Sequence, residues 1–302
     1  MCLDRPSAAA AAGRELLRAE LPRLGLNRRI RSMRRLSGGY VASAWLVAFA
    51  DGSRVAATTM ADAPANLFQV EADGLTALSA TLCLRTPEVI AATDRLIVLE
   101  ALGRRDDGEQ SWEAFAHDLA AVHRTTVHDR FGWPADGYLG RITQRNPWTA
   151  DGHEFFARHR VLRYLEEPAV LHELTSADRQ ALERFCDRLT EIIPAMPPVL
   201  THGDLWPGNL LSAEDGRIAV IDPAVSYTWA EVDLSMLWCC QRPPASQRFF
   251  DVYQEINPSP PGWAERMPLL HVRELLSSIA GTGGSEGEAG RLRSALAPFY
   301  RH

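Results

Sequence analysis

The chain has 302 residues and a formal net charge of −6, and 46% of its residues are hydrophobic. A chain of this length can bury the core of one large domain or of two lobes. No apolar run reaches the ~18 residues of a transmembrane helix, and the N-terminus lacks the charge pattern of a secretory signal. We therefore expect no membrane insertion, and because no basic block is present to neutralise phosphates, we expect no nucleic-acid binding either.

Cysteine and lysine usage both narrow the possibilities. The cysteines are scattered, with no CxxC pair, at Cys2, Cys83, Cys186, Cys239 and Cys240. This pattern disfavours structural zinc and a disulfide framework, and it favours the reducing cytoplasm. The sequence contains no lysine, so all 32 of its Lys and Arg residues are arginines. A biased codon pool is the simplest explanation, since alanine is abundant too.

The first third of the chain is predicted to be rich in strands. Residues 11–24 have apolar positions at helical spacing, and Pro22 is predicted to end that helix. Residues 30–60 are predicted to form three strands, joined by a Ser-Gly-Gly turn and an Asp-Gly turn. Residues 64–80 return to a helical period, with Pro64 suited to the first turn. Two short strands follow, PEVIAAT and RLIVLEAL.

The remainder is predicted to be mainly helical. A polar connector, residues 103–108, precedes three segments with helical apolar stripes, which are SWEAFAHDLAAVHRTT, HEFFARHRVLRYL and SADRQALERFCDRLTEII. A hairpin, LLSAEDGRIAVID, comes next, and further helices run to the end. A glycine-rich stretch near Gly281 is predicted to be a loop between helices. A strand-rich part with one helix therefore precedes a helical part.

The stretch VLTHGDLWPGNLL, residues 199–211, and the hairpin after it carry the strongest chemical signal. Asn209 lies five residues after Asp204, and Asp222 lies thirteen residues beyond Asn209. The turn of the hairpin should bring Asp222 beside the loop that holds the other two side chains. Oxygen ligands suit Mg²⁺, which binds one or two carboxylates plus substrate phosphates. A remaining acid can orient an attacking hydroxyl, so the group is typical of phosphoryl transfer.

Each residue of this group also has a structural explanation. Asp204 or Asn209 alone could make the hydrogen bonds of a turn. The three residues at this spacing, however, favour the chemical interpretation. His202 is expected to pack and hydrogen-bond the loop rather than to act as a base.

On these motifs the sequence resembles the fructosamine kinase (ketosamine 3-kinase) family, within the aminoglycoside-phosphotransferase-like, protein-kinase-like fold. The matching stretches begin at about residue 30 and include LSGGY, FQVEADGL, LAAVHRTT, FGWPADGYLGRITQRNPW, THGDLWPGNLL, AVIDPAV, EVDLSMLW and FFDVYQEINPSPPGW. The resemblance implies a two-lobed α+β fold. An N-lobe with an antiparallel sheet and one helix would span residues 1–102, and a mainly helical C-lobe residues 103–302.

The resemblance also implies roles for the central residues. Asp204 would be the catalytic residue that orients the acceptor hydroxyl, with Asn209 and Asp222 as the Mg²⁺ ligands. Asp233 would brace the catalytic loop. The residues that would hold ATP are Ser37, Gly38, Gly39, Thr58, Glu71, Glu100 and Leu102. The residues that would lie at the substrate are Trp206, Trp229 and Glu231.

Simpler explanations stay open for several of these residues. The Gly-Gly pair by itself is typical of a plain hairpin turn, and a lone helix glutamate such as Glu71 is typically a solvated surface residue. Trp206 could equally be a packing residue. Glu100 and Leu102 would act only through their backbone groups, which would receive adenine between the lobes.

The sequence departs from the family pattern at the third strand. There the family has a lysine that contacts the ATP phosphates and pairs with the helix glutamate. The aligned residue is Thr58, and no lysine elsewhere can replace it. Only an arginine such as Arg54 or Arg35 could reach in, and a forked guanidinium is not equivalent to an ammonium group. Without a cation Glu71 also lacks its partner.

Further departures fall near the expected substrate side. Tyr40 replaces a loop cysteine of some relatives, so the redox switch and disulfide dimer known for them should be absent, and a monomer or weak dimer is expected. Trp229-Ala230 replaces a usual His-Arg pair, and Ser277-Ser278 replaces a usual Asn-His pair. These changes indicate a more apolar acceptor, different from a simple fructosyl-lysine.

Two functions from different classes are therefore compared. The first is an ATP- and Mg²⁺-dependent kinase of a ketosamine or related small molecule, favoured by the intact trio of Asp204, Asn209 and Asp222. The second is a kinase fold without kinase activity, either a pseudokinase or an enzyme of specialised metabolism acting on a sugar–amine conjugate. The missing lysine favours the second, and the fold alone does not decide between them.

Overall fold

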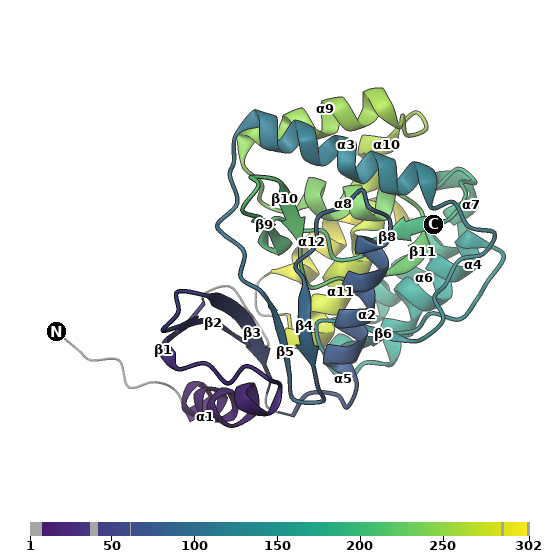
Figure 1. Cartoon of the computed structure of the whole chain (residues 1–302). Coiled ribbons are helices and arrows are strands. Elements are labelled where there is room, and N and C mark those ends of the chain that lie inside the picture. Colours follow the sequence, from purple (N-terminus) through teal and green to yellow (C-terminus); the bar gives the residue numbers. More distant parts are fainter. Residues whose placement is uncertain (1–7, 37–41, 61, 285–286, 301–302) are drawn as a thin grey trace.

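The computed structural model describes residues 8–36, 42–60, 62–284 and 287–300. Its N-terminal part is built on a five-stranded antiparallel sheet with strand order β1-β2-β3-β5-β4 (Figure 1). The elements of this part are α1 (Ala8–Arg23), β1 (Ile30–Arg35), β2 (Ser43–Phe49), β3 (Arg54–Thr59), α2 (Leu67–Ser79), β4 (Val89–Ala92) and β5 (Leu96–Glu100). The predicted strands of residues 30–60 and the two after them are confirmed.

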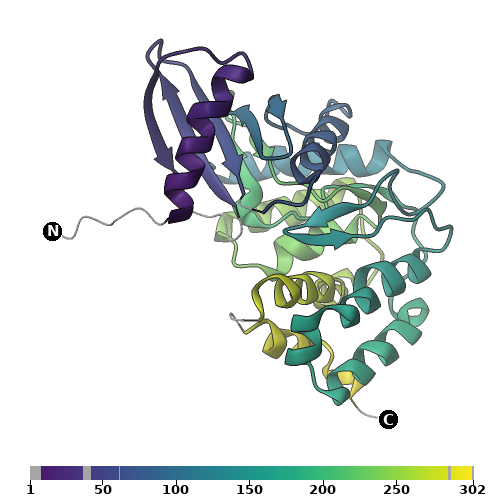
Figure 2. The ribbon, with the colours of Figure 1, turned by 90° about the horizontal axis from the view of Figure 1, so that it is seen from below.

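Strand β5, which lies between β3 and β4, is buried because a helix covers each face of the sheet. Side chains alternate across a strand, so neighbouring residues point to opposite faces. Leu96 and Val98 belong to the core beneath α1, whereas Ile97 and Leu99 belong to the core beneath α2. Figure 2 shows α1 lying against the sheet. The continuous apolar run of β5 therefore reflects burial on both faces.

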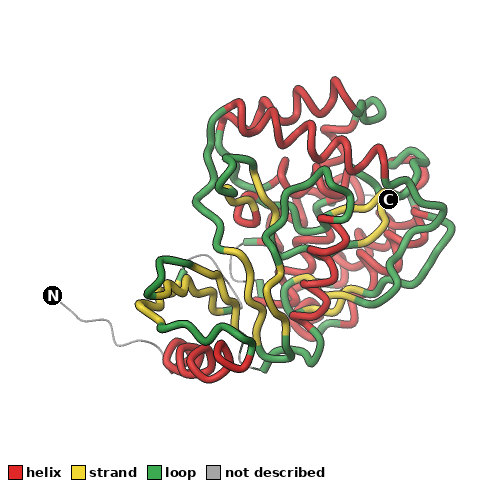
Figure 3. The backbone as a smooth tube through the Cα atoms, in the orientation of Figure 1, coloured by secondary structure: helices red, strands yellow, loops and turns green. Residues whose placement is uncertain are grey.

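The C-terminal part is dominated by helices (Figure 3). They are α3 (Glu109–Thr125), α4 (Gly152–Phe156), α5 (Pro168–Glu173), α6 (Ser176–Asp187), α7 (Leu189–Ile192), α8 (Glu231–Cys239), α9 (Gln247–Ile256), α10 (Trp263–Leu270), α11 (Val272–Thr282) and α12 (Glu288–Ala295). One large apolar core joins them. Within it α3 and α9 pack through aromatic rings, as where Phe115 stacks on Phe249 at 5.3 Å between centroids. None of the helices in the described ranges is long and apolar enough to cross a bilayer.

Three small two-stranded sheets position the loops between these helices. Their strands are β6 (Gly137–Leu139) with β7 (Ile142–Gln144), β8 (Val199–Thr201) with β11 (Ser226–Thr228), and β9 (Leu210–Ser212) with β10 (Ile218–Val220). The loop 202–209 runs from β8 to β9, and the loop 221–225 runs from β10 to β11. Because each loop joins the same two sheets, the pairing holds the two loops side by side.

Three sequence predictions need correction. The single helix predicted over residues 153–165 is divided into α4, a π-helical turn (Ala157–Val161) and a 3-10 turn (Leu162–Glu166). The two turns let both Arg160 and Arg163 point inward, where they are buried. The helix predicted over 176–193 is interrupted after α6, and Pro22 lies inside α1 instead of ending it.

The connection between the two parts is short and irregular. Residues 101–108 form no helix or strand, although Gly103 exchanges backbone hydrogen bonds with Ser212 at 2.7 and 3.1 Å. We propose the boundary of the lobes after Leu102, which gives an N-lobe of residues 1–102 and a C-lobe of residues 103–302. The loop predicted near Gly281 is only partly confirmed: Gly281 itself lies inside α11, and non-helical backbone begins after Thr282, where Gly283 has a left-handed φ of 76°.

Candidate active site

The loop after β8 is forced into an unusual backbone conformation. Gly203 has a φ of +78°, and a Cβ atom at this position would lie 2.1 Å from the carbonyl oxygen of Ala224. Only glycine satisfies both conditions. Asp204 follows directly and is half-buried. The geometry of this loop therefore fixes where the Asp204 carboxyl group can point.

His202 holds the loop from inside, as expected. Its Nδ1 accepts a hydrogen bond from the backbone N–H of Asp204 at 3.2 Å, and its Nε2 lies 2.9 Å from the carbonyl oxygen of Ile221. Burial lowers the pKa of His202 to about 4, so the imidazole is neutral at pH 7. A neutral ring with Nε2–H donating satisfies both contacts.

Asp233 braces the same loop from α8. It accepts hydrogen bonds from the backbone N–H groups of His202 and Gly203, both at 2.8 Å, and it lies 3.3 Å from Nε2 of His123. Burial opposes its ionisation, yet these partners hold the pKa of Asp233 below its ordinary value. The bracing role expected of Asp233 is therefore what the geometry provides.

Asp204, Asn209 and Asp222 come together in one cavity. The Nδ2 of Asn209 donates to the backbone oxygen of Asp204 at 2.9 Å and to its Oδ2 at 3.0 Å. Asp222 lies just beyond β10 and has a φ of 54°. The backbone N–H of the preceding residue, Ile221, donates to the carbonyl oxygen of Asn209 at 3.0 Å. All three line a cavity of about 210 Å³ between α2, the sheet and the two loops.

The walls of this cavity come from both parts of the chain. They include two predicted nucleotide residues, Thr58 and Glu71, and one predicted substrate residue, Trp206. The other lining residues are Ala42, Met60, Leu67, Phe68, Val70, Tyr138, Leu139, Gly140, Pro223 and Ala224. Trp206 lies close over Gly208, where an added Cβ would meet the indole at 2.2 Å.

Glu71 and Asp222 face each other without a basic side chain between them. One carboxylate oxygen of Glu71, Oε1, is buried and has no hydrogen-bond partner. Burial, and then the charge and hydrogen bonding of Asp222, raise the pKa of Glu71 well above its ordinary range. No arginine is among the described residues that line the cavity, and Arg54 and Arg35 are exposed. An arginine substitute for the lysine is therefore not found there.

Asp204 also lies in a charged environment. Burial and the charge of Glu274 raise the pKa of Asp204 well above its ordinary range, and the positive charge of Arg273 opposes them. Both residues belong to α11, the helix behind the loop. Sequence patterns gave no signal for this pair, because two charged residues in an amphipathic helix are typical of a solvated face.

The remaining predicted nucleotide residues are less well placed. Glu100 and Leu102 do not line the cavity with Asp204. The side chain of Glu100 accepts a hydrogen bond from Arg85 at 2.5 Å, and it accepts another from the backbone N–H of Glu88 at 3.1 Å. A role for their backbone groups in binding adenine stays a prediction. Ser37, Gly38 and Gly39 lie outside the described residues.

Two predicted substrate residues are corrected by the structure. Trp229 is only 1% exposed and packs among aromatic rings of the C-terminal core, 5.5 Å from the ring of Phe156. Glu231 is equally buried, and its two carboxylate oxygens accept hydrogen bonds from Arg266 at 2.5 and 2.9 Å. Burial in the core and this ion pair leave neither side chain directed at a substrate.

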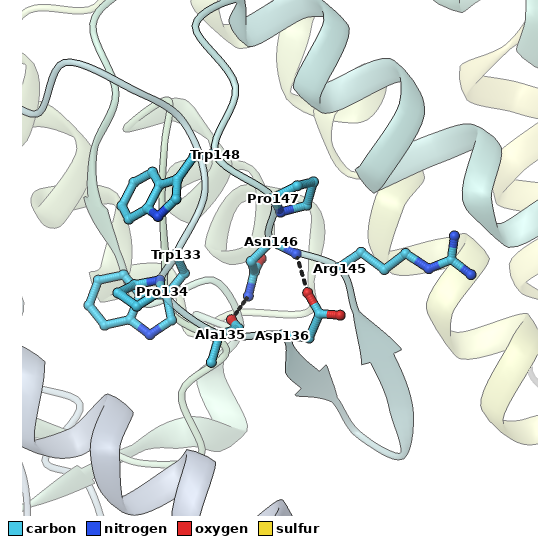
Figure 4. Close-up of a pocket in the computed structure, with 8 residues that line it drawn as sticks. All are labelled: Trp133, Pro134, Ala135, Asp136, Arg145, Asn146, Pro147 and Trp148. Carbon is cyan, nitrogen blue, oxygen red and sulfur yellow. Dashed lines mark hydrogen bonds between the residues drawn. The ribbon is translucent and has the colours of Figure 1, made fainter.

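A second cavity, of about 310 Å³, is lined by none of the predicted catalytic residues, and Figure 4 shows the residues that do line it. Its walls are formed by the segments before β6 and after β7, residues 133–136 and 145–148. Asn146 closes it, donating to the carbonyl oxygen of Ala135 at 3.0 Å and receiving a bond from Arg160 at 2.6 Å. Its larger volume does not make it the active site, because it contains none of the group around Asp204.

Sequence reasoning missed a link between these regions. Gln144, at the end of β7, is 1% exposed and donates to the carbonyl oxygen of Ala224 at 3.0 Å. Ala224 in turn donates its N–H to the carbonyl oxygen of His202 at 2.8 Å. Gln144 therefore supports the loop that carries Asp222, although nothing in its local sequence indicates that contact.

Comparison with known proteins identifies the family of this chain. Residues 19–291 match the model of a protein family described as "Fructosamine kinase". The chain belongs to the fructosamine kinase family. It is 32% identical over 270 residues to "Probable ketoamine kinase slr1563" of Synechocystis sp., covering 85% of this chain and 86% of that protein.

Two further relatives extend the fructosamine kinase assignment. The chain is 30% identical over 291 residues to "Protein-ribulosamine 3-kinase, chloroplastic" of Oryza sativa subsp. indica, covering 93% of this chain and 83% of that protein. A solved structure from Thermobifida fusca, described as a "putative fructosamine-3-kinase", superposes with a TM-score of 0.81 at 31% identity. It covers 91% of this chain and 98% of its own. The two-lobed kinase-like fold is therefore confirmed.

Proposed function

We propose that this protein is an ATP-dependent kinase that phosphorylates a hydroxyl group of a ketosamine, a sugar joined to an amine. The observation that carries the proposal is the convergence of Asp204, Asn209 and Asp222 on one cavity between the sheet and the helical part. The relatives named as ketoamine and ribulosamine kinases support the substrate class.

Asp204 is the proposed catalytic residue. In the reaction the acceptor hydroxyl oxygen bonds to the γ-phosphorus of ATP, the bond to the β–γ bridging oxygen breaks, and ADP leaves. Asp204 orients the hydroxyl and receives its proton. Asn209 keeps the Asp204 carboxyl group in place through its Nδ2 hydrogen bond of 3.0 Å.

The residues present fit a Mg²⁺ ion that arrives with the nucleotide. No group of three or more His, Cys, Asp or Glu side chains that could hold a metal is found in the described part of the chain. Asn209 and Asp222, which both line the cavity of Asp204, would be the protein ligands, with the remaining positions left to phosphate oxygens and water, as Mg²⁺ prefers. The bound ion would neutralise charge on the phosphates.

A pseudokinase is the second candidate, and one observation favours it. Thr58 occupies the cavity wall where the family has its lysine, and it supplies no positive charge to ATP. The comparisons do not favour this candidate, because the relatives that cover most of the chain are named as kinases. A kinase with a weakened nucleotide clamp accounts for both observations.

The proposal is tested by magnesium-dependent ATP turnover with a panel of ketosamines and amino sugars. We expect transfer to at least one ketosamine, and we expect Asp204→Asn to lower kcat by about 10²- to 10⁴-fold while nucleotide affinity changes little. Asparagine keeps the size and a hydrogen-bonding oxygen but cannot accept the proton. Turnover near the wild-type rate in Asp204→Asn, or no transfer to any ketosamine, would contradict the proposal.

The metal ligand is tested separately by binding. Asp222→Ala is expected to abolish the magnesium-dependent part of nucleotide affinity, because the variant removes the only carboxylate proposed to hold the ion. Calorimetric titration of ATP with and without Mg²⁺ measures this part directly, without turnover. Asp215→Ala, in the exposed hairpin turn before β10, is the matched control. Equal affinities in Mg²⁺ for wild type and Asp222→Ala would show that the ion binds elsewhere.

We also propose a cytoplasmic location and a monomer or weak dimer. The location is supported by the thiols, since Cys83, Cys186, Cys239 and Cys240 are free. Burial raises the pKa of Cys186, Cys239 and Cys240 to about 12, which makes them poorly reactive.

A further inference from the structure

Both backbone polar groups of Gly203, the residue before Asp204, are held by charged side chains. The N–H of Gly203 donates to Asp233 of α8 at 2.8 Å. The carbonyl oxygen of Gly203 accepts a hydrogen bond from the guanidinium of Arg273, on α11. Side chains from two helices, α8 and α11, therefore hold the backbone of Gly203, with a carboxylate at its N–H and a guanidinium at its carbonyl oxygen.

Arg273 satisfies this carbonyl group with a buried positive charge. Arg273 is only 1% exposed, and burying a guanidinium costs more free energy than burying a neutral donor such as an amide. The neighbouring Glu274 offsets part of that cost, since its Oε1 lies 2.5 Å from Nη2 of Arg273. A hydrogen bond alone does not explain why a charge is buried at this position.

The position of Arg273 relative to Asp204 does explain it. The carbonyl that Arg273 holds belongs to the peptide that joins Gly203 to Asp204, so the guanidinium sets the orientation of the backbone from which the Asp204 side chain projects. Gly203 cannot be supported in another way by a side chain of its own, because a Cβ would overlap Ala224. The cation also stands close enough to Asp204 to favour its ionised form.

We propose that Arg273 is a positioning residue for phosphoryl transfer, which orients Asp204 through the Gly203 carbonyl, and that Glu274 orients Arg273. This inference rests on the proposed function, because it concerns the same catalytic loop. It assigns to α11 a part in the chemistry although Arg273 does not line the cavity of Asp204.

The inference is tested by kinetics of Arg273→Met, which removes both the hydrogen bond and the charge. We expect kcat to fall roughly 10²-fold, since misplacement of a reacting group by about 1 Å has an effect of that size. The KM for ATP should stay close to that of the wild type, because Arg273 does not line the nucleotide cavity. Arg273→Lys should recover part of kcat, since it restores a cationic donor with a shorter reach.

A matched control separates positioning from general stability. Arg184 also donates to a backbone carbonyl, that of Phe299 at 2.6 Å, and it is remote from the catalytic loop. Arg184→Met should lower the melting temperature without changing kcat per folded molecule. A kcat for Arg273→Met equal to that of the wild type would overturn the inference. A rise in the KM for ATP as large as the fall in kcat would overturn it too. If Arg273→Met does not fold, Glu274→Gln and Arg273→Lys decide: reduced kcat in both supports it, and wild-type kcat in both overturns it.

A readout without turnover keeps this inference distinct from the proposed function. If the wild type phosphorylates no ketosamine, the proposed function fails, whatever Arg273 does. Amide hydrogen exchange of Gly203 and Asp204 in the wild type and in Arg273→Lys then decides the inference. Faster exchange of these two amides in the variant, with unchanged exchange in α8, supports a positioning role, and identical exchange overturns it.

Discussion

Thr58 stands where the resemblance to the family predicts the lysine that contacts the ATP phosphates. It lies on β3, opposite Ile97 of β5, and on the wall of the cavity that contains Glu71 and Asp222. Thr58 offers no cation to Glu71, whose Oε1 is buried without a hydrogen-bond partner. A buried polar atom without a partner carries a free-energy cost of about 1–3 kcal/mol, so we expect Glu71 to lower the stability of the fold and the site to bind ATP weakly.

Thr58→Lys is therefore expected to increase both nucleotide affinity and phosphoryl transfer. The new ammonium group would pair with Glu71 and neutralise phosphate charge, and we expect a modest gain in kcat/KM for ATP. Steady-state kinetics of the two proteins side by side measure it, with Thr58→Met as a control of similar length and no charge. A clear loss of transfer in Thr58→Lys would show that the site holds ATP in a different manner.

At the scale of elements, the close packing of α2 on the loop 221–225 brings Glu71 to Asp222. Gly74 lies one turn after Glu71, on the same face of the helix. A Cβ at Gly74 would lie 3.1 Å from Cγ of Pro223 and 3.5 Å from Val225. The glycine thus allows an approach that a larger residue would prevent, at the cost of lower helix propensity.

Substitution of Gly74 should separate these two effects. Gly74→Val is expected to lower the free energy of unfolding by about 1–3 kcal/mol through overpacking and to weaken nucleotide binding by displacing Glu71. Gly290, in α12, has open space around its Cα, so Gly290→Ala should gain up to about 1 kcal/mol from helix propensity alone. Urea unfolding and ATP titration measure both effects. A Gly74→Val variant as stable as the wild type would contradict the packing argument.

The elements also show which features a sequence can predict. The strands of residues 30–60 and the trio in the loops followed from periodicity and spacing, because local patterns determine them. The division of residues 152–166 did not, since a π-helical turn changes which side chains face inward without changing the amphipathic pattern. The resemblance to the family predicts Trp229 at the substrate, yet the fold buries it. Arg273 and Gln144 act through contacts distant in sequence, which no local pattern reveals.

At the scale of the whole molecule, the absence of lysine gives the interior a particular chemistry. Four buried arginines are found among the described residues, and each donates to a carbonyl or carboxylate oxygen. They are Arg160, Arg163, Arg266 and Arg273. A guanidinium makes several directional bonds that an ammonium group cannot reproduce. The same arginines hold the C-terminal part together, so the lysine-free composition affects stability more broadly than the single change at Thr58.

Buried histidines make the stability of the whole molecule depend on pH. Burial, with the charges of Arg291 and Arg273, lowers the pKa of His271 to about 4, and burial lowers the pKa of His202 to about 4 as well. Unfolded histidine has a pKa near 6.5, so between pH 4 and 6.5 the unfolded state binds more protons. The free energy of unfolding then decreases as the pH falls through this window. Glu274, whose pKa is raised to about 7, acts in the opposite direction. Its contribution to the free energy of unfolding decreases as the pH rises from about 4.5 to 7.

Because these contributions oppose each other in the wild type, the contribution of His271 is best measured as a difference. His271→Leu removes one proton-binding site from the unfolded state, and it leaves no buried imidazole to be charged on α11. The slope of unfolding free energy against pH should therefore become smaller by up to about 1.4 kcal/mol per pH unit between pH 4 and 6.5. Urea unfolding at several pH values measures the slope, with the exposed His172→Leu as the control. A slope in His271→Leu equal to that of the wild type would show that His271 is not kept neutral by the fold.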